Sequence, residues 1–288
     1  MTDRKIIITT ESTCDIPRCE QERLGIFTVS TYIMIGGRSY LDWTEITTSD
    51  FFELTKARDI RPTTSAVPVH DYETLFRQFD GQDADILHIA VSQNFSACFN
   101  NAVVAAQSFK NVHVFDAKNV SAGLALAIYR AVDLRDRGFA IQDIISDLSA
   151  YVDRIRFNCV LDTVDFIRRG GRLSATVALG IELLKIKPEI LLRDGKIVIG
   201  RKYRGKLDKA LGSFVENQLK NVSHIDKTRV LVANTLRDHE LLARLRDTVA
   251  KRLPDSETIV VEVGSVISCH AGLSTRSEER RVGKECRS

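Results

Sequence analysis

Residues 85–115, DILHIAVSQNFSACFNNAVVAAQSFKNVHVF, contain two short apolar runs on either side of a longer segment with helical spacing. The pattern predicts a strand over Asp85–Val91, a helix over Ala97–Phe109 and a second strand over Val112–Phe115. A polar turn over residues 92–96 joins the first strand to the helix. This order of strand, helix and strand is typical of a parallel sheet that is covered by helices on both faces.

The same alternation extends along the rest of the first half of the chain. The β-branched run Lys5–Thr9 predicts a buried first strand, and Pro17 can open a short helix to Leu24 with Gly25 as its stop. Phe27–Ile35 is expected as a strand. Helices are expected after Ser49 as N-cap, and over Val69–Phe79, Ser121–Arg137 and Ile141–Ile155. Residues 1–160 are therefore predicted to form an α/β domain on a parallel sheet.

The second half is organised differently, around a predicted β-hairpin. Ile190–Leu192 and Lys196–Ile199 flank Asp194-Gly195, a dipeptide that favours the type I′ hairpin turn. Further strands are expected over Asn158–Leu161, Arg229–Ala233 and Thr258–Val263, and helices over Thr163–Arg169, Leu173–Ile186, Leu207–Leu219 and Asp238–Arg252. A hairpin among strand–helix units predicts a mixed sheet, so residues 161–275 are assigned to a second, mixed α/β domain.

Residues 276–288 form a charged tail in which Val282 is the one branched aliphatic residue. A segment of this composition lacks the apolar side chains needed to bury itself. Two interpretations stay open: a solvated tail, or residues that do not belong to the native end of the chain. In the second case, a final strand or pocket wall of the native protein would be missing.

Composition excludes several classes of protein. The 288 residues are 44% hydrophobic and 27% charged, as in soluble globular proteins, and the net charge of +3 gives no reason to expect a nucleic-acid partner. Six cysteines without a C-x-x-C pair are expected to be reduced thiols. No apolar run matches a signal peptide or a membrane span, so we expect a cytoplasmic protein without stable membrane insertion.

The common catalytic and cofactor motifs are missing from the sequence. It contains no G-x-S-x-G elbow, Walker loop, G-x-G-x-x-G or H-E-x-x-H, and no His or Cys set at zinc-ligand spacing. We therefore predict no catalytic residue, no metal and no cofactor.

Three hydroxyl-rich clusters, Ser12-Thr13, Thr63-Thr64-Ser65 and Ser92 to Ser96, are expected where strands or turns end and helices begin. Ligands of open parallel sheets bind beyond the carboxyl ends of the strands, and helix N-termini there favour an anionic group. Each cluster alone has the ordinary explanation of helix capping. His270, near an expected strand end, has the ordinary explanation of a structural histidine.

Taken together, the chain resembles the DegV family over residues 5 to about 272. The segment Thr10-Glu11-Ser12-Thr13-Cys14-Asp15-Ile16-Pro17 is similar to the family's opening D-S-x-x-D-[LI]-P. The other matching segments are Pro62-Thr63-Thr64-Ser65, Ser92 to Ser96, Leu161-Asp162-Thr163, Arg169-Gly170-Gly171-Arg172-Leu173-Ser174, Leu184-Lys185-Ile186-Lys187-Pro188, Asp194-Gly195, Arg204-Gly205 and His270-Ala271-Gly272.

The resemblance implies a two-domain bacterial carrier that holds a long-chain fatty acid between its domains. In some bacteria such carriers present the acid to a separate fatty acid kinase, which makes the acyl phosphate. By position, the family's carboxylate contacts correspond to Thr64, Ser96 and His270. Arg172 and Arg204 match family arginines near the pocket mouth, and an anion or partner contact is implied for them.

The chain departs from the family pattern at several of these positions. The family's aspartate before Ser12 is Glu11, the glutamine after its T-S pair is Ala66, and the S-G-T motif is Ser96-Ala97-Cys98. Alanine allows the backbone less freedom than glycine, and a thiol is a weaker donor than a hydroxyl. The departures therefore bear on the geometry of the head-group contacts and on the choice of ligand.

Two other functions stay open. One is a serine-dependent acyl hydrolase that uses Ser96 with His270, for which the sequence offers no clear orienting acid. The other is a regulator that binds a sugar phosphate or another anion, with Arg172 and Arg204 suited to phosphate. If a fatty acid is the ligand, the candidate lining is Leu124–Ala131, Phe166-Ile167 and Val177–Leu184.

Overall fold

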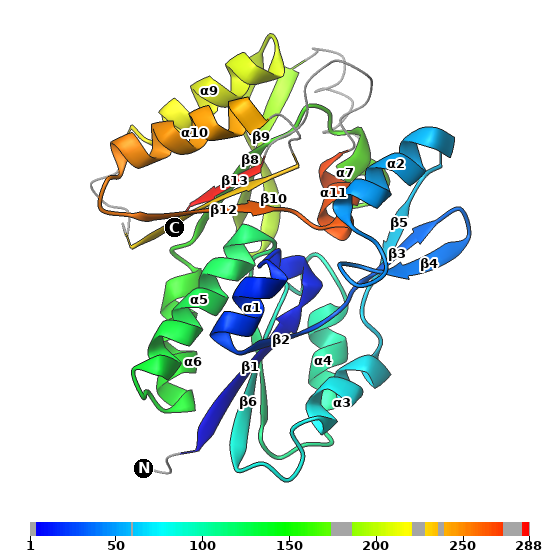
Figure 1. Ribbon diagram of the computed structural model, residues 1–288, viewed down its shortest axis with the longest axis vertical. Helices are drawn as coiled ribbons and strands as arrows, with labels where there is room; N and C mark the ends of the chain where they lie inside the picture. Colours follow the sequence, from blue (N-terminus) through cyan, green and yellow to red (C-terminus); the bar gives the residue numbers. More distant parts are fainter. Residues whose placement is uncertain are drawn as a thin grey trace.

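The computed structural model describes residues 4–58, 60–173, 186–220, 228–235, 239–272 and 284–287 (Figure 1). Its N-terminal part is a four-stranded parallel sheet in the order β2-β1-β6-β7. The strands are β1 (Lys5–Glu11), β2 (Ile26–Val29), β6 (Ala84–Ala90) and β7 (Val112–Asp116). The predicted parallel sheet is thus confirmed, and β1 extends two residues beyond the expected Thr9.

Helices cover both faces of this sheet, as predicted. In Figure 1, α3 (Val69–Arg77) and α4 (Cys98–Ala106) lie on one side, and α5 (Ala122–Asp136) and α6 (Ile141–Val152) lie on the other. The helix α1 (Arg18–Leu24) packs on β2 and ends at Gly25, whose φ of +63° is the left-handed conformation expected of a helix stop.

The expected strand over Phe27–Ile35 is instead two strands in different sheets. β2 ends at Val29, and β3 (Tyr32–Ile35) joins an antiparallel sheet with β4 (Arg38–Leu41) and β5 (Thr63–Ser65) in the order β4-β3-β5. At the break, the backbone N–H of Thr31 donates to Ser12 Oγ at 3.1 Å. That bond joins residues 19 positions apart, which a local sequence pattern does not show.

This region differs from the sequence pattern in a missed strand and in the cap of a helix. The strand itself was not expected: Thr63-Thr64-Ser65 is β5, which pairs with β3 so that Thr64 lies opposite Ile33, and it ends before α3 begins, as expected of the cluster. The helix α2 (Thr48–Arg58) is capped by Thr47 rather than Ser49: Asp50 N–H donates to Thr47 Oγ1, and Thr47 N–H donates to Asp50 Oδ2. This reciprocal pair is a capping box with aspartate as its acid.

The second sheet is mixed, as predicted, and has the order β10-β9-β8-β13-β11-β12. Its strands are β8 (Arg156–Val160), β9 (Ile186–Arg193), β10 (Lys196–Arg204), β11 (Arg229–Asn234), β12 (Glu257–Glu262) and β13 (Lys284–Arg287). The β9–β10 hairpin turns at Asp194 and Gly195, whose φ values of +50° and +67° fit the predicted type I′ turn. The helices α9 (Leu207–Gln218) and α10 (His239–Arg252) lie over this sheet (Figure 1).

The helix α5 lies between the two sheets and packs against strands of both. Because the two sheets enclose this part of the helix from both sides, residues 122–129 are all buried and form no polar face. One hydrophobic cluster accordingly runs from the first sheet through α5 to β8, β9 and β11. The first and second sheets therefore share a core.

The division at residues 160 and 161 stays a prediction, although two features bear on it. β8 ends at residue 160, before the expected boundary, and already belongs to the second sheet. Residues 284–287, within the charged tail, pair as a strand, β13, with β8 and β11. The helix expected over residues 173–186 lies almost wholly outside the described residues.

A short helix that the sequence pattern did not predict, α11 (Ser265–Ala271), follows β12. It packs against α2, β3, β5 and the short helix α7 (Asp165–Arg169), and so joins the small sheet to the second half of the chain. His270 lies in its last turn rather than at a strand end. None of the helices in the described ranges is long and apolar enough to cross a membrane.

Candidate functional site

A pocket opens between the two larger sheets and the small sheet. Its empty volume is about 830 Å³ when the open space at its mouth is included. Most of its lining is apolar and comes from β8, β9, β10, α7 and α11: Phe157, Leu161, Ile167, Ile190, Leu192, Ile197, Val266 and Ile267. The pocket therefore offers a continuous apolar surface with polar groups at a few positions.

Thr64, Ser96 and His270, which we call the head-group site, all line this pocket. Thr64 Oγ1 and His270 Nε2 share a hydrogen bond of 2.8 Å that links β5 to α11 across 206 residues. Both side chains are half-buried. A hydroxyl beside an imidazole at the edge of an apolar pocket can donate hydrogen bonds to an anionic oxygen.

Gly170, at the end of α7, fixes the space available to the His270 ring. A Cβ atom on Gly170 would lie 2.2 Å from His270 Nδ1, so only glycine lets the backbone approach the ring this closely. The φ of −70° at Gly170 is one that any residue can adopt, so the backbone conformation does not require glycine. The close contact with the His270 ring does.

Ser96 lies just before α4 and is held by the start of that helix. Its Oγ accepts a hydrogen bond from Cys98 N–H at 3.2 Å and donates to Cys98 Sγ at 3.1 Å. Ala97 between them has φ −71° and ψ −2°, so alanine replaces the family's glycine here without backbone strain. Burial raises the pKa of the Cys98 thiol, and the negative charge of Glu11 raises it further, so the thiol stays protonated at neutral pH.

Arg172 lies at the mouth of the pocket, where it is exposed and its Nε donates to the carbonyl of Phe95 at 3.0 Å. The hairpin turn approaches the same loop, since a Cβ on Gly195 would lie 2.5 Å from Ser92 Oγ. A polar recess outside the pocket shares Ser96 and Arg172 with it and adds Lys196. A recess that carries two cations therefore adjoins the pocket at Ser96.

The structure separates some of the expected residues from the pocket. Arg204 is exposed at the end of β10 and does not belong to the pocket lining. Residues 124–131 are not lining residues either, because packing between the two sheets uses the apolar surface of α5. Of Phe166-Ile167, only Ile167 lines the pocket, and Val177–Leu184 lies outside the described residues.

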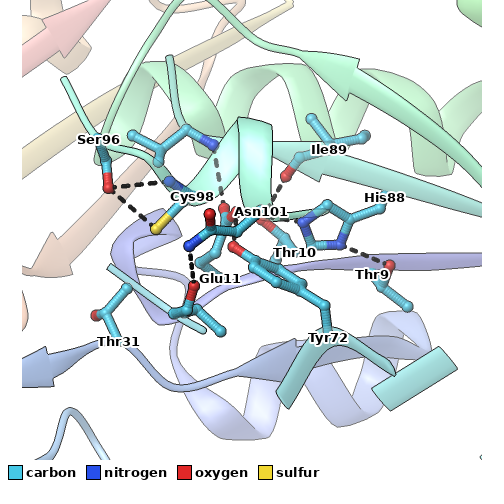
Figure 2. A network of polar contacts seen from close by, with 12 residues as sticks. Thr9, Thr10, Glu11, Thr31, Tyr72, His88, Ile89, Ser96, Cys98 and Asn101 are labelled. Atoms are coloured by element: carbon cyan, nitrogen blue, oxygen red, sulfur yellow. Dashed lines mark hydrogen bonds and ion pairs between the residues drawn. The ribbon is translucent and has the colours of Figure 1, made fainter. Parts of the chain in front are cut away.

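A buried polar network lies beside the pocket, around Glu11 at the carboxyl end of β1 (Figure 2). Glu11 is fully buried, and its Oε1 accepts hydrogen bonds from Tyr72 Oη at 2.8 Å and from His88 Nε2 at 3.2 Å. Its Oε2 accepts from Val91 N–H at 3.0 Å, and Thr9 Oγ1 bonds His88 Nδ1 at 2.9 Å. Glu11 thereby fixes the end of β6, from which the loop to Ser96 starts.

The chain matches the model of an uncharacterised protein family, DegV, over residues 5–277. The chain belongs to the DegV family. This confirms the resemblance drawn from the opening motif and the glycine-rich segments. A DegV domain-containing protein of Caldanaerobacter subterraneus subsp. tengcongensis is 29% identical to it over 273 residues, 93% of this chain and 95% of that protein.

Solved DegV structures have the same fold. One, described as fatty acid binding of a DegV family protein from Thermus thermophilus, is 28% identical, with a TM-score of 0.86 and coverage of 99% of both chains. Another, described as DegV, a fatty acid binding protein from Bacillus subtilis, is 25% identical, with a TM-score of 0.86 and coverage of 98% of both chains. The DegV proteins of known structure thus include fatty acid-binding proteins.

Sequence reasoning missed part of the DegV pocket. Thr31 and Cys159 line it, yet neither lies in a motif. Thr13 also lines it and belongs to one of the hydroxyl clusters. Cys159 lies on a strand that the sequence predicts, and that strand packs against α5. A strand buried on both faces has no alternating pattern, so the sequence does not show which of its residues line a cavity.

Proposed function

We propose that this protein binds a long-chain fatty acid in the pocket between its domains and presents the carboxyl group to a separate fatty acid kinase. The observation that carries the proposal is that one mostly apolar pocket is lined by the hydrogen-bonded pair Thr64 and His270 and by Ser96. The fatty acid-binding DegV proteins of the same fold support it.

The apolar lining supplies the attraction for the chain of the acid. Each methylene taken from water contributes about 0.8 kcal/mol, so a 16-carbon acid gains roughly 10 kcal/mol before the costs of ordering it. The side chains of β8 and β9 that line the pocket are uncharged and include Phe157, Ile190 and Leu192. A sugar phosphate would leave the same surface unused.

The head-group site supplies the partners that a carboxylate needs when it leaves water. Thr64 and Ser96 can turn their hydroxyl hydrogens from protein acceptors to the ligand, and His270 can donate or share a proton. Ser96 bonds the weak acceptor Cys98 Sγ, an arrangement that supplies no base to activate it as a nucleophile. We therefore assign these residues to binding rather than to hydrolysis.

Presentation to a kinase requires that the carboxyl group be reachable, and the recess with Arg172 and Lys196 reaches the head-group site at Ser96. In this proposal the phosphoryl chemistry belongs to the partner, and the DegV protein contributes the bound acid and the surface around it. Arg172 at that recess is the residue that we assign to an anion or partner contact, whereas Arg204 lies outside it.

Replacing Thr64, Ser96 and His270 together by alanine is expected to weaken hexadecanoate binding by about 1,000-fold or more, because charge-assisted hydrogen bonds contribute about 1.5–3 kcal/mol each. Isothermal titration measures the affinity, and circular dichroism verifies the fold. The control replaces the same residue types on the surface, with Thr74, Ser149 and His70, all exposed, changed to alanine. Binding by the triple variant equal to that of the control variant would refute the site.

A further inference from the structure

The helix α11 carries His270 but is only seven residues long, and a helix of this length is not stable on its own. Its N-cap, Gly264, has no side chain to accept hydrogen bonds from the first N–H groups. Two aspartates from the first 42 residues take that role. Gly264 N–H donates to Asp15 Oδ1 at 2.8 Å, and Ser265 N–H donates to Asp42 Oδ1 at 2.9 Å.

We propose that Asp15 and Asp42 are positioning residues for His270, because together they fix the start of the helix whose last turn places the imidazole in the pocket. The inference rests on the proposed function in that His270 is taken as a ligand contact. Neither aspartate lines the pocket, so both act through α11.

The two carboxylates are themselves held firmly. Asp15 is 1% exposed and its Oδ2 accepts from Ser121 Oγ at 2.5 Å, while Asp42 is 0% exposed and its Oδ2 accepts from Ser12 Oγ at 3.1 Å. Ser12 in turn shares a hydrogen bond of 2.7 Å with Thr31, a pocket residue. The start of α11 is thus tied to the loop after β1 and to the beginning of β3.

The start of α11 lies too close to Asp42 and Trp43 for the helix to shift along its axis without a clash. A Cβ on Gly264 would lie 2.3 Å from Trp43 Nε1 and 3.0 Å from Asp42 Oδ2. Trp43 itself has a φ of +63°, a conformation rare for a bulky residue, which the surrounding contacts must maintain. The start of the helix is therefore located by a tight fit as well as by two hydrogen bonds.

The position of the helix start determines the position of the ring. At about 1.5 Å per residue, His270 lies roughly 7 Å along the axis from Ser265, so a tilt at the start moves the imidazole directly. The ring has little room for such movement, because Thr64 bonds Nε2 on one side and the backbone of Gly170 lies against Nδ1 on the other.

Both oxygens of the Asp42 carboxyl accept hydrogen bonds, Oδ1 from Ser265 N–H and Oδ2 from Ser12 Oγ. Burial raises the pKa of the Asp42 carboxyl from 3.8 to about 6, against the opposing hydrogen bonds from Ser12 and from the N–H groups of Ser265 and Val266. Asp15, the other buried carboxyl group at the start of α11, binds the adjacent N–H. Because the folded pKa is the higher one, the stabilising contribution of protonated Asp42 is lost as the pH rises through 6.

The test compares Asp42→Asn with the wild-type protein in two measurements. The first is the imidazole nitrogen chemical shifts of His270 in the ligand-free protein, and the second is hexadecanoate affinity between pH 5 and 8. We expect the variant to fold, to be relatively more stable than the wild type at pH 8, to shift the His270 signals, and to bind about 10-fold more weakly at pH 7.5. The affinity difference should vanish near pH 5, where Asp42 of the wild type is also neutral.

Asp15→Asn is the second variant, since asparagine tolerates the left-handed conformation of residue 15, whose φ is +57°. It should shift the His270 signals in the same way. Asp247→Asn on α10, where the carboxylate is exposed, is the control and should change neither measurement.

Unchanged His270 signals in both variants would overturn the proposal, and so would an affinity loss in Asp42→Asn that is equal at every pH. If the wild-type protein itself does not bind hexadecanoate, the proposed function fails. The His270 signals of the ligand-free variants still decide whether the aspartates position the ring.

Discussion

Replacing Glu11 by leucine is expected to lower the free energy of unfolding by about 3–9 kcal/mol. The carboxylate accepts hydrogen bonds from Tyr72, His88 and the backbone of Val91, and all of these groups lie inside the fold. Leucine fills similar space but leaves each of these polar groups without an acceptor, at about 1–3 kcal/mol apiece. The shift in the urea midpoint, followed by circular dichroism, measures the loss.

The matched control is Glu22→Leu, at an exposed position of α1, which should move the midpoint little. A double-mutant cycle sharpens the test. Tyr72→Phe should destabilise the wild-type protein more than it destabilises Glu11→Leu, because the hydroxyl has already lost its acceptor there. Equal costs in the two backgrounds would show that Tyr72 and Glu11 are not coupled.

Changing Gly170 to alanine is expected to weaken hexadecanoate binding by about 10-fold or more, equivalent to roughly 1.4 kcal/mol. The added methyl would meet His270 Nδ1 at 2.2 Å, so the imidazole must leave its place beside Thr64. The backbone at residue 170 accepts alanine without strain, and the loss should therefore appear in affinity while stability changes little.

Gly212→Ala is the control for this prediction. Gly212 lies inside α9, and a Cβ there would meet nothing within 4 Å. Alanine at that position should raise stability by up to about 1 kcal/mol through helix propensity and leave affinity unchanged. Wild-type affinity in Gly170→Ala would mean that the position of the His270 ring does not matter for binding.

Much of the fold is predictable from local patterns, since apolar runs and turn residues act over short distances. The Asp194-Gly195 turn is one example, because both residues adopt the positive φ values that the dipeptide favours. The break between β2 and β3 was not predictable, since the bond from Thr31 to Ser12 that accompanies it joins separate segments. The helix α11 was missed for a related reason: six of its seven residues are buried, so it has no polar face to reveal its period.

The candidate site divides in the same way. Thr64, Ser96 and His270 were found through family motifs, and the structure brings the three into one pocket. The groups that support them, Gly170 behind the imidazole and Asp42 before α11, act through contacts between residues more than 90 positions apart. No motif or period in the sequence marks such contacts. Arg204 was carried over from the family pattern, and the position of β10 keeps it outside the pocket.

The most direct test of the central claim is organic extraction of the purified protein followed by mass spectrometry. The pocket is apolar along most of its lining and ends at hydroxyl and imidazole groups, so a protein that binds fatty acids should retain one from the cell. We predict a C14–C18 fatty acid at close to one molecule per chain, and much less in the Thr64, Ser96 and His270 triple alanine variant. Recovery of a polar phosphate compound in place of a fatty acid would contradict the account.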